Sequence, residues 1–458
     1  MTATSEHRVL SRDPLNSEPT PSTLIATFIT PPSLSYNRNH GAFVSPPTPY
    51  SLSISSEVPA VDLDAKQFSL EALKADFGRD DVIAALVCAG NRRNEMNEEK
   101  ETEGLQWGGT ALANVEVGGA LLRDVLAQCG ITLEKLEATG FADKLHLHFE
   151  TTQHCSEGDE DYFGVSLPVK LALDPSRPVV LAYDQSGAPL QEAHGAPLRL
   201  LVPGVIGARS VKWLERVILR VHESDSFFQK RDYKVLPPEA TPETKQEYLK
   251  QTAPLMEYPL NSEICEPSPG AVLSLSASGA KSTITVKGYA LGANGIPISR
   301  VSLALVPLPL SSPPPSSPSH SSSSPPLPNE HLHHLRLAAS ALPPSRWCSA
   351  ALTSCVEGGD PFAAEETGGE GEDEGKGGKR NWGWTLWSAE VEVPEEVGKM
   401  VELAVGGGEG VEVALVCYTE DKNGQKQELE TPYNLRGVGE ASWSVIEVRL
   451  VKGVEKAS

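Results

Sequence analysis

The chain has 458 residues, 39% of them hydrophobic, and a formal net charge of −22 at pH 7. Its length is sufficient for two or three domains with sizeable cores, and its acidic balance argues against nucleic acid or an anionic membrane as a partner. The seven cysteines form no CxxC pair, which favours a reducing compartment and argues against a zinc module.

Neither end of the chain carries a clear targeting signal. The first residues, MTATSEHRVLSRDPLNSEPTPS, lack the apolar core of a secretory signal, and the last residues, EKAS, are not a peroxisomal address. No apolar run approaches the roughly 18 residues that a membrane-spanning helix needs. We therefore expect a cytoplasmic protein without a membrane partner, with a mitochondrial or peroxisomal location as the alternatives.

The first residues are rich in Ser, Thr and Pro, which predicts a disordered N-terminus over 1–23. From Leu24 the prolines predict a mostly extended segment, in which Tyr36, Arg38 and His40 alternate and share one face. An aromatic ring, a fixed cation and an imidazole that face together can hold an oxyanion or a phosphate group. A polar loop face explains the same three residues equally well.

The chain is organised around the apolar run Val82–Cys88, which predicts a short buried strand. Gly90 and Asn91 allow a sharp turn, and Arg92 and Arg93 follow at once. A sulfur at the end of a rigid strand, beside two cations, is held toward the thiolate that a soft metal requires as its ligand. The alternative is a buried structural cysteine beside surface arginines.

Helices are predicted on both sides of this strand. Ser69 can cap a short helix, LEALKADF, over 70–77. A second helix is predicted by apolar residues at helical spacing: Leu121, Leu122, Val125, Leu126 and Cys129. Gly130 ends that helix, and we expect Cys129 to lie in the core.

A half-buried strand is predicted where Leu145, Leu147 and Phe149 alternate with polar residues. A zinc site could be formed by the polar residues in and just beyond this strand, His146, His148, His154 and Cys155. Histidines on the polar face of a strand are usually solvated, so we expect no metal there.

Basic residues gather in the segment 194–212, HGAPLRLLVPGVIGARSVK. His194 and Arg199 bracket one turn, and Arg209 and Lys212 follow a second, glycine-rich turn. Four donors on rigid turns suit a phosphate-bearing cofactor, although surface basic residues are the alternative. Further along, a tyrosine in R-D-Y-K lies in a charged loop, where packing is the commoner role.

The composition changes after Tyr258. Residues 24–258 form the first predicted domain, and short alternating strands with an Asn294-Gly295 hairpin signal predict an immunoglobulin-like β-sandwich over 259–458. Two low-complexity insertions interrupt this sandwich, a Pro/Ser-rich one at about 307–344 and an acidic, Gly-rich one at about 356–379. We expect the first to be a flexible surface excursion, and we find apolar periodicity in neither.

Several of these motifs together resemble the sulfite oxidase family of molybdopterin-dependent oxidoreductases. They are Y-x-R-N-H, CAGNRR, the dense set H-G-x-P-x-R, V-P-G, G-A-R and V-K-W-L, then R-D-Y-K and N-L-R-G. The resemblance covers roughly 24–458 apart from the two insertions. It implies an α+β fold, in which a mixed α/β molybdopterin-binding domain precedes an immunoglobulin-like dimerisation domain that pairs two chains as a homodimer.

The resemblance also implies roles for individual residues. Cys88 is expected as the only protein ligand to molybdenum, and Arg38, Arg93, Arg436 and Tyr233 as the catalytic residues that hold sulfite. The residues expected to bind the molybdenum–molybdopterin cofactor are Tyr36, Asn37, Arg38, Asn39, His40, Cys88, Gln153, His194, Arg199, Ser210, Val211 and Lys212.

This chain departs from the family pattern at three of the positions considered. In the family a W-G-G sequence before the helix supplies a Trp to the substrate pocket, and Val117 stands at that position here. Gln153 stands where the family tends to place an Asp that contacts the pterin, and Ser210 where many relatives carry His.

The activity implied is the oxidation of sulfite to sulfate by oxygen-atom transfer. A nitrate-reducing relative on the same scaffold is one alternative, and a cofactor-binding protein without turnover is another. R-D-Y-K and N-L-R-G fit the sulfite branch. Fewer than forty residues precede the Y-N-R-N-H motif, and His7 is the one histidine among them. We therefore expect no haem in this chain and a transfer of electrons to dioxygen or a separate acceptor.

Overall fold

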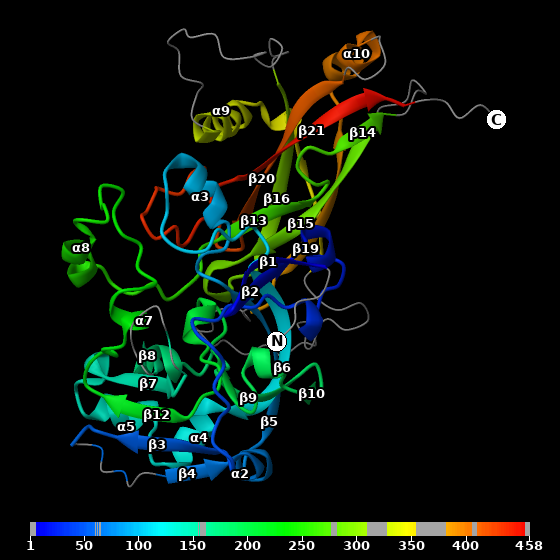
Figure 1. Cartoon of the computed structure of the whole chain (residues 1–458). Helices are drawn as coiled ribbons and strands as arrows, with labels where there is room; N and C mark the ends of the chain where they lie inside the picture. The colour runs from blue at the N-terminus through cyan, green and yellow to red at the C-terminus, as the bar shows by residue number, and fades with distance from the viewer. Residues whose placement is uncertain are drawn as a thin grey trace, which may run out of the picture.

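Among the described residues, two five-stranded sheets and a two-stranded hairpin build the first part of the chain, and two further sheets build the second part (Figure 1). The computed structural model describes the residues 6–59, 61, 63, 66–153, 155, 162–275, 282–308, 328–353, 382–404 and 410–453. We refer to the part before Tyr258 as the first domain and to the part after it as the sandwich.

The first sheet presents Cys88. β5 (Arg79–Val87) pairs antiparallel with β6 (Leu112–Leu121), which pairs in turn with β9 (Val180–Gln185). The short strands β10 (Ala188–Pro189) and β11 (Arg199–Leu201) pair with β9. The predicted apolar strand is confirmed, and Cys88 follows its last residue.

The second sheet of the first domain has the strand order β4-β3-β12-β7-β8. Its strands are β3 (Ser51–Ser56), β4 (Lys66–Ser69), β7 (His146–Thr151), β8 (Phe163–Pro168) and β12 (Arg216–Arg220). β12 pairs parallel with β3 and antiparallel with β7. The short helices of this domain are α2 (Leu70–Ala75), α3 (Arg93–Glu99), α4 (Leu122–Gln128), α5 (Leu133–Ala138), α6 (Val169–Ala172), α7 (Phe227–Lys230) and α8 (Lys245–Gln251).

The predicted caps are present on two of these helices. The Ser69 hydroxyl accepts a hydrogen bond from Ala72 N at the start of α2. Gly130 has a φ of 82° just after α4, where the left-handed conformation ends the helix. Cys129 is buried in the core, as expected.

The second half is a β-sandwich, as predicted. One sheet has the order β13-β15-β19-β18 and the other β14-β21-β20-β16-β17. The strands are β13 (Asn261–Glu266), β14 (Val272–Leu275), β15 (Thr283–Leu291), β16 (Ile298–Pro307), β17 (Trp347–Ser349), β18 (Ala351–Thr353), β19 (Thr385–Glu392), β20 (Val411–Asp421) and β21 (Ser444–Lys452). In the described part of this half, two helices accompany the strands, α9 (Pro328–Ser340) and α10 (Glu395–Leu403).

The hairpin expected at Asn294-Gly295 is absent. These residues, with φ values of 52° and 70°, turn the chain between β15 and β16, which lie in different sheets. The turn signal was therefore read correctly, but the pairing inferred from it was wrong.

The expectation of a disordered N-terminus over 1–23 is wrong for the described residues from 6 onward. β1 (His7–Arg12) and β2 (Leu15–Pro19) form an antiparallel hairpin, followed by α1 (Pro21–Leu24). Every residue of β2 is buried, and the Glu18 carboxylate accepts from Gly108 N. Polar composition misled the prediction because these side chains are buried through hydrogen bonds to other parts of the first domain.

The expectation for the insertion at about 307–344 needs a correction too. α9 occupies residues 328–340, and Leu332, Leu335 and Ala339 pack with the sandwich strands. Apolar residues at helical spacing are thus present at the end of the Pro/Ser-rich tract. Residues 309–327 and the acidic insertion at about 356–379 lie outside the described residues.

The buried side chains form separate cores for the two parts of the chain. The larger core belongs to the first domain, but Tyr289, Trp384 and Val438 of the second half also contribute to it. The core of the sandwich is formed by residues from Leu260 onward. Within the described ranges, no helix is both long and apolar enough to cross a bilayer.

Candidate active site

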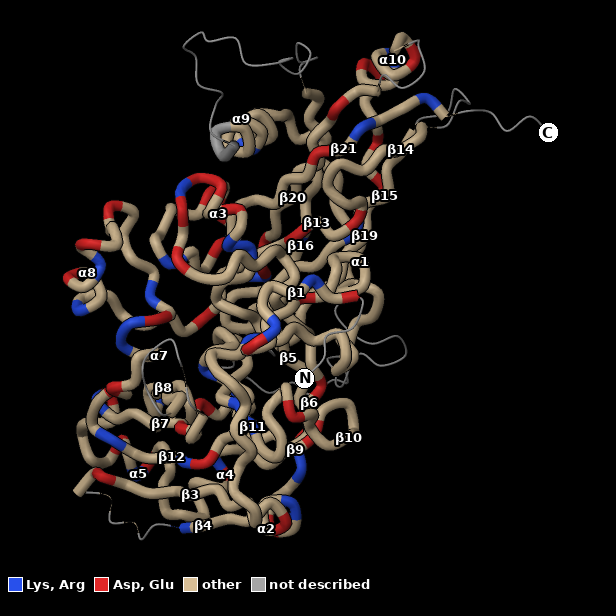
Figure 2. Tube along the Cα trace, in the orientation of Figure 1, with Lys and Arg blue, Asp and Glu red and all other residues tan. Residues whose placement is uncertain are grey.

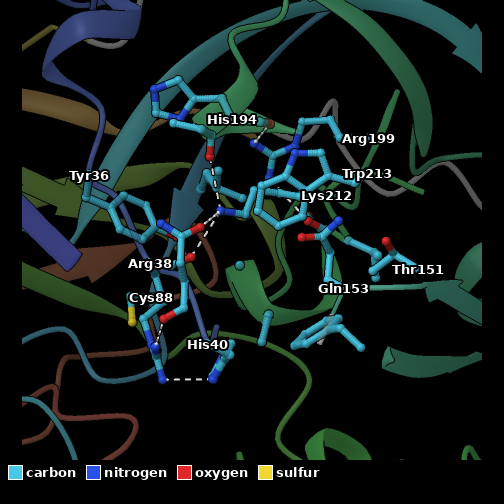
Figure 3. Close-up of a pocket in the computed structure, with 18 of the residues that line it drawn as sticks. Tyr36, Arg38, His40, Cys88, Thr151, Gln153, His194, Arg199, Lys212 and Trp213 are labelled. Carbon is cyan, nitrogen blue, oxygen red and sulfur yellow. Dashed lines mark hydrogen bonds between the residues drawn. The ribbon is translucent and has the colours of Figure 1, made fainter. Parts of the chain in front are cut away.

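A deep cavity in the first domain is lined by most of the residues that the motifs singled out (Figure 3). The segment 36–40 contributes Tyr36, Arg38, Asn39 and His40 to one wall. The rest of the wall contains the other residues expected at the cofactor: Cys88, Gln153, His194, Arg199, Ser210, Val211 and Lys212.

Asn37 is the exception among these expected residues. Its backbone pairs with Ser17, and its side-chain nitrogen donates to the Ser17 hydroxyl at 3.0 Å. Asn37 therefore ties the motif to the N-terminal hairpin and does not line the cavity. The extended backbone alternates its side chains, which explains why Tyr36 and Arg38 face the cavity while Asn37 faces the hairpin.

The cavity is cationic because Arg38, Arg199 and Lys212 line it, and no Asp or Glu is among its described lining residues. Burial lowers the pKa of Arg199 to about 10 and also lowers the pKa of Lys212, with neighbouring cations adding to the effect at Lys212. Buried cations without an anion are costly, so this arrangement indicates an anionic ligand.

Backbone carbonyls hold two of these cations in place. Lys212 Nζ donates to Arg38 O at 3.1 Å and to Ala193 O at 3.0 Å. Arg199 donates to His194 O at 3.0 Å and to Ser210 O at 3.2 Å. Both cations are thus fixed before a ligand arrives, which reduces the entropy lost on binding.

His194 is neutral in this environment. Burial, followed by the charges of Lys212 and Arg199, lowers the pKa of His194 to about 3. Its Nε2 lies 2.9 Å from Pro32 O, which can only accept, so Nε2 carries the proton. A neutral His194 adds no further positive charge to the cavity.

Gln153 and Ser210, two of the three departures from the family pattern, bond mainly to the protein backbone. Gln153 pairs with both backbone groups of Val44, accepting from its N–H and donating to its C=O. The Ser210 hydroxyl accepts from Val202 N at 3.0 Å. Both residues therefore hold loops of the cavity wall in position.

A second cavity adjoins the first, and both are lined by Arg38, Cys88 and Tyr233. The second cavity adds Arg93 and, from the sandwich, Arg436. Cys88 and the four residues expected to hold sulfite thus border one space, although their roles remain predictions.

Arg92 and Arg93, neighbours in the sequence, point to different places. Arg93 borders the second cavity, while the wholly buried Arg92 reaches the sandwich, where it donates to Asn261 and Ser442. Burial raises the pKa of the Cys88 thiol, and Arg93 and Arg38 offset only part of that effect. The expectation that two adjacent cations hold Cys88 as a thiolate is therefore wrong for the protein alone. Metal coordination would itself deprotonate the thiol.

Three glycines enclose the side chain of Arg93. A Cβ atom on Gly90, Gly104 or Gly437 would lie 2.7, 2.7 or 2.6 Å from an Arg93 side-chain atom. Arg93 Nε donates to Arg436 O at 3.0 Å, and its Nη1 donates to Leu105 O at 2.9 Å. These partners are uncharged carbonyls, so they leave the Arg93 charge available to an anion in the cavity.

Arg436, by contrast, is paired with carboxylates. It contacts Asp232 and also donates to Glu103 at 3.1 Å. Burial raises the pKa of Asp232, but Arg436 and the other nearby cations outweigh it and hold the net pKa below its usual value. Lys245 in turn pairs with Glu103. Figure 2 shows that acidic residues are prominent around α3 and the loop after it.

Tyr233 is held in a strained backbone conformation with a φ of 44°. Asp232 accepts from its N–H at 2.9 Å, and Leu255 N donates to its C=O at 2.8 Å. The Tyr233 hydroxyl lies 2.7 Å from His40 Nε2. The conformation places the phenol at the wall shared by the two cavities.

The hydrogen bonds around His40 define its tautomer. Arg38 Nη2 lies 3.0 Å from His40 Nδ1, and because a guanidinium can only donate, Nδ1 accepts. A neutral His40 therefore carries its proton on Nε2 and donates to Tyr233. The Tyr233 oxygen accepts this bond, so its own O–H is directed toward other acceptors.

The pocket tryptophan is Trp107, which the sequence analysis missed. Trp107 is fully buried beside Cys88 and Tyr233, and its indole N–H has no hydrogen-bond partner among the described residues. Val117 pairs with Val82 in the middle of the sheet, so the pocket does not lose an aromatic wall there. Trp107 is followed by Gly108 and Gly109, a W-G-G sequence that could have identified it.

Two other expectations for basic and metal-ligating residues need correction. Arg209 bonds to Leu255 O and Phe228 O behind Tyr233 and does not line the cavity. Among the described residues, no group of three or more His, Cys, Asp or Glu could hold a metal ion, and the expectation of solvated histidines is wrong for His148, which is buried. His154, a member of the zinc alternative, lies outside the described residues.

Two domain families match the chain. Residues 40–228 match the oxidoreductase molybdopterin binding domain, and residues 252–306 match the Mo-co oxidoreductase dimerisation domain. A sulfite oxidase of Arabidopsis thaliana is 28% identical over 443 residues, which cover 97% of this chain and 94% of the relative. The chain belongs to the sulfite oxidase family.

Other relatives differ in how much of their own length is matched. The mitochondrial sulfite oxidase of Mus musculus is 31% identical over 97% of this chain, which spans 66% of that enzyme. A nitrate reductase [NAD(P)H] of Hordeum vulgare is 36% identical over 65% of this chain, but only 33% of that enzyme is matched. The sulfane dehydrogenase SoxCD from Paracoccus pantotrophus shares the fold, with a TM-score of 0.62 at 19% identity over 99% of this chain and 91% of that one.

The donor set fits the molybdopterin cofactor of this family of molybdenum oxidoreductases. Cys88 would supply the soft thiolate that molybdenum takes, and Arg38, Arg199 and Lys212 would neutralise the phosphate. Among the described residues, the buried Arg199 Nε has no hydrogen-bond partner, so the cavity wall holds a donor not yet used.

Proposed function

We propose that this chain oxidises sulfite to sulfate and passes two electrons to dioxygen or to a separate acceptor. The convergence of Arg38, Arg93, Arg436 and Tyr233 on one cavity with Cys88 carries the proposal. Three guanidiniums around one space would bind an oxyanion, and a phenol beside them can donate one more hydrogen bond.

The chemistry of the bound cofactor is oxygen-atom transfer coupled to two-electron reduction. The chain's own residues bind and orient the substrate for it. Arg38 and Arg93 would hold sulfite oxygens from the first domain, while Arg436 closes the same space from the sandwich. With the oxygens held by these cations, the lone pair on the substrate sulfur is left to face the Cys88 side of the cavity.

Acidic partners adjust how strongly this cavity holds an anion. Asp232 and Glu103 pair with Arg436, so they orient the guanidinium and neutralise part of its charge. Sulfite becomes sulfate as it gains one oxygen atom, with water as the ultimate source and two protons released. A cavity with unbalanced positive charge would retain the sulfate dianion, so partial neutralisation favours product release.

Nitrate reduction is the second candidate because a nitrate reductase is 36% identical over the matched region. The R-D-Y-K and N-L-R-G motifs, with Tyr233 and Arg436 at the cavity, favour sulfite instead. Steady-state sulfite oxidation with ferricyanide, compared with nitrate reduction by a reduced dye, separates the two. Turnover of nitrate without turnover of sulfite would overturn the proposal, and a loaded protein inactive on both would be a cofactor-binding protein.

Two further parts of the proposal have simple tests. We propose that this chain binds no haem, so the purified protein should lack a Soret band, and peroxide formed per sulfite consumed identifies dioxygen as the acceptor. We also propose a homodimer through the sandwich, supported by the match to a dimerisation domain. Sedimentation at a single-chain mass over the working concentration range would contradict the homodimer.

A further inference from the structure

α9 lies beside α3, the helix that begins at Arg93 (Figure 1). α9 is the part of the Pro/Ser-rich insertion that the structure describes as a helix. It lies after residues 252–306, the part of the sandwich that matches the dimerisation-domain family. Its apolar residues Leu335 and Ala339 pack on β16 and β20, which fixes the helix to the sandwich. The helix is thus held by apolar packing, independently of the one charge that is buried among its described side chains.

That charge is Arg336, whose side chain is only 5% exposed. Its Nε donates to Trp443 O at 2.9 Å, and its Nη2 donates to Glu95 Oε2 at 3.3 Å. Trp443 follows the loop 432–442, which carries Arg436, and Glu95 lies on α3. Arg336 therefore joins the end of this loop to the helix that follows the cysteine turn.

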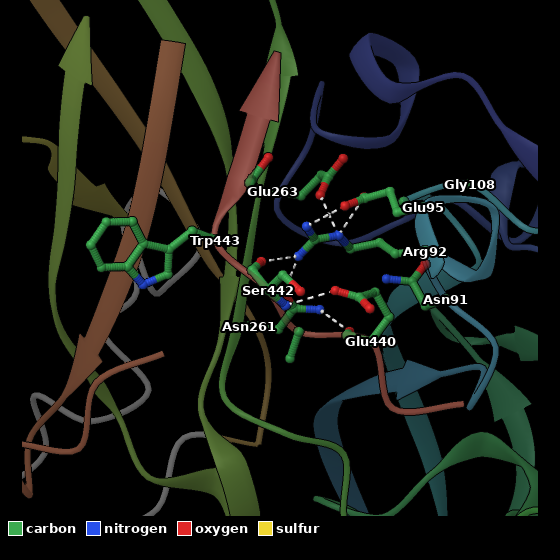
Figure 4. A network of polar contacts seen from close by, with 12 residues as sticks. Asn91, Arg92, Glu95, Gly108, Asn261, Glu263, Glu440, Ser442 and Trp443 are labelled. Atoms are coloured by element: carbon green, nitrogen blue, oxygen red, sulfur yellow. Dashed lines mark hydrogen bonds and ion pairs between the residues drawn. The ribbon is translucent and has the colours of Figure 1, made fainter. Parts of the chain in front are cut away.

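Glu95 extends the connection to the cysteine turn itself (Figure 4). It accepts from Arg92 Nε at 2.7 Å and from Arg92 Nη2 at 2.8 Å. Arg92 Nη1 donates to Ser442 O at 2.8 Å and to Asn261 Oδ1 at 2.7 Å. Arg92, which is wholly buried with a φ of 64°, thus fixes the turn between Cys88 and α3 to the sandwich.

The same loop and turn also touch directly. Gly439 N donates to Ala89 O at 2.9 Å, and Arg93 Nε donates to Arg436 O at 3.0 Å. Glu103 N donates to Leu435 O at 2.8 Å. The place of Arg436 relative to Cys88 therefore depends on how firmly residues 432–443 are held against α3.

We propose that Arg336 is a positioning residue for the oxidation of sulfite: from α9 it holds the Arg436 loop against α3 and the cysteine turn. This inference rests on the proposed function for its kinetic consequence, but its structural part does not. Loss of Arg336 would leave α9 packed and would release the loop end at Trp443, so Arg436 would bind the oxyanion less well.

The test is Arg336→Met in the full-length, molybdenum-loaded protein, because Met keeps the apolar stem and removes the donors. The matched control is Arg346→Met, which removes an ion pair with Glu396 at the surface close to α9. We expect Arg336→Met to raise the KM for sulfite and the Kd for sulfate about 3–10-fold while kcat changes less than about twofold. Arg346→Met should leave both constants unchanged.

A second measurement needs no turnover. Hydrogen exchange at the amides of Gly439 and Glu103 should accelerate in Arg336→Met, because their acceptors lie across the same contact. Arg336→Lys keeps the charge near Glu95 and should restore part of the affinity for sulfite and sulfate. If the Met variant does not fold, the same measurements are made on Arg336→Lys. Unchanged sulfate affinity and unchanged exchange in a folded variant, even one of lower stability, would show a merely structural role and overturn the inference. If the wild-type protein does not oxidise sulfite, the proposed function is wrong. Hydrogen exchange and the affinity for sulfate, measured together, still decide the role of Arg336 in that case.

Discussion

At the scale of single residues, Cys88 and Arg436 show how chemistry is divided between the two parts of the chain. Cys88 follows a strand of the first domain, and Arg436 comes from a loop of the sandwich, yet both border one cavity. Cys88 is 7% exposed, and the cations that act on its thiol are Arg93 and Arg38. Each residue can therefore be changed without altering the element that carries the other.

Cys88→Ser should leave the fold almost intact, because the two side chains are similar in size. Turnover should be abolished, because a hydroxyl does not replace a soft thiolate ligand at molybdenum. Metal analysis and sulfite oxidation of the purified variant check this, with circular dichroism as the control for folding. Full activity in this variant would be incompatible with Cys88 as the metal ligand.

Arg436→Met should raise the KM for sulfite about tenfold or more, since a hydrogen bond to a charged group contributes roughly 1.5–3 kcal/mol. Asp232 would also lose its main partner, and the pKa of its carboxyl would rise. Because the pKa of Asp232 in the folded protein lies below the unfolded value of 3.8, its ionised carboxyl stabilises the fold above that pH, and this stabilisation is lost as the pH falls. The stabilisation should be smaller in the variant. Steady-state kinetics and denaturant unfolding across that pH range measure the two effects, and an unchanged KM would mean that the sandwich does not serve the site.

At the scale of elements, the sequence predicted the buried strand, the helix caps and the sandwich because these depend on local patterns. The cysteine strand is a continuous apolar run, and Ser69 caps its helix within three residues. The elements that the sequence did not predict depend on contacts between residues far apart in the chain. The hairpin β1–β2 buries polar side chains against the motif at 36–40, and Asn294-Gly295 turns between sheets instead of within one.

The candidate site was predictable to a similar extent. Nearly all of the site residues that the motifs singled out line the two cavities, but the motifs could not tell which way a side chain points at the end of a strand or turn. Arg92 and Arg209 were grouped with the site by position, and both point elsewhere. Trp107 was missed because the W-G-G pattern was expected just before the next helix, where Val117 stands. The fold instead places Trp107 beside Cys88.

The hairpin β1–β2 provides the sharpest test at this scale. Asn16 Oδ1 accepts from Asn39 N at 2.9 Å and from Arg38 Nη1 at 3.3 Å, so it supports the cavity wall from outside. Asn16→Leu keeps the shape and removes these bonds, and it should reduce the free energy of unfolding by about 1–3 kcal/mol and raise the KM for sulfite. Urea unfolding and kinetics measure both, with Asn423→Leu at the exposed turn after β20 as control. If both variants behave alike, the hairpin does not support the site.

At the scale of the whole molecule, the two domains are joined by a buried polar network. Arg92 contacts Glu95 from its own domain and Glu263 from the sandwich, at 2.7 and 3.0 Å. Glu440 lies beside it, and burial raises the pKa of both Glu263 and Glu440. Trp384 and Val438 from the sandwich half complete the core of the first domain. The two parts should therefore unfold together.

This network predicts a pH dependence of stability. Burial raises the pKa of Glu263 to about 8 against an unfolded value of 4.5, so between these values the folded protein keeps a proton that the unfolded chain has released. The free energy of unfolding should therefore fall as the pH rises through this window. Glu263→Gln should flatten that dependence, and the exposed Glu428→Gln should not. Urea unfolding at several pH values measures the slopes, and equal slopes in the wild type and Glu263→Gln would contradict this assignment.

The cationic cavity ties the lifetime of the protein in a cell to the supply of its cofactor. Arg38, Arg199 and Lys212 line it without a carboxylate among the described residues, so a chain that has not received its anion carries their full desolvation cost. Binding of the cofactor relieves that cost and stabilises the fold by mass action. Chains left without the cofactor open more often and are removed by proteases sooner. Cells short of molybdopterin should therefore contain less of this protein, even when they make its messenger RNA at the normal rate.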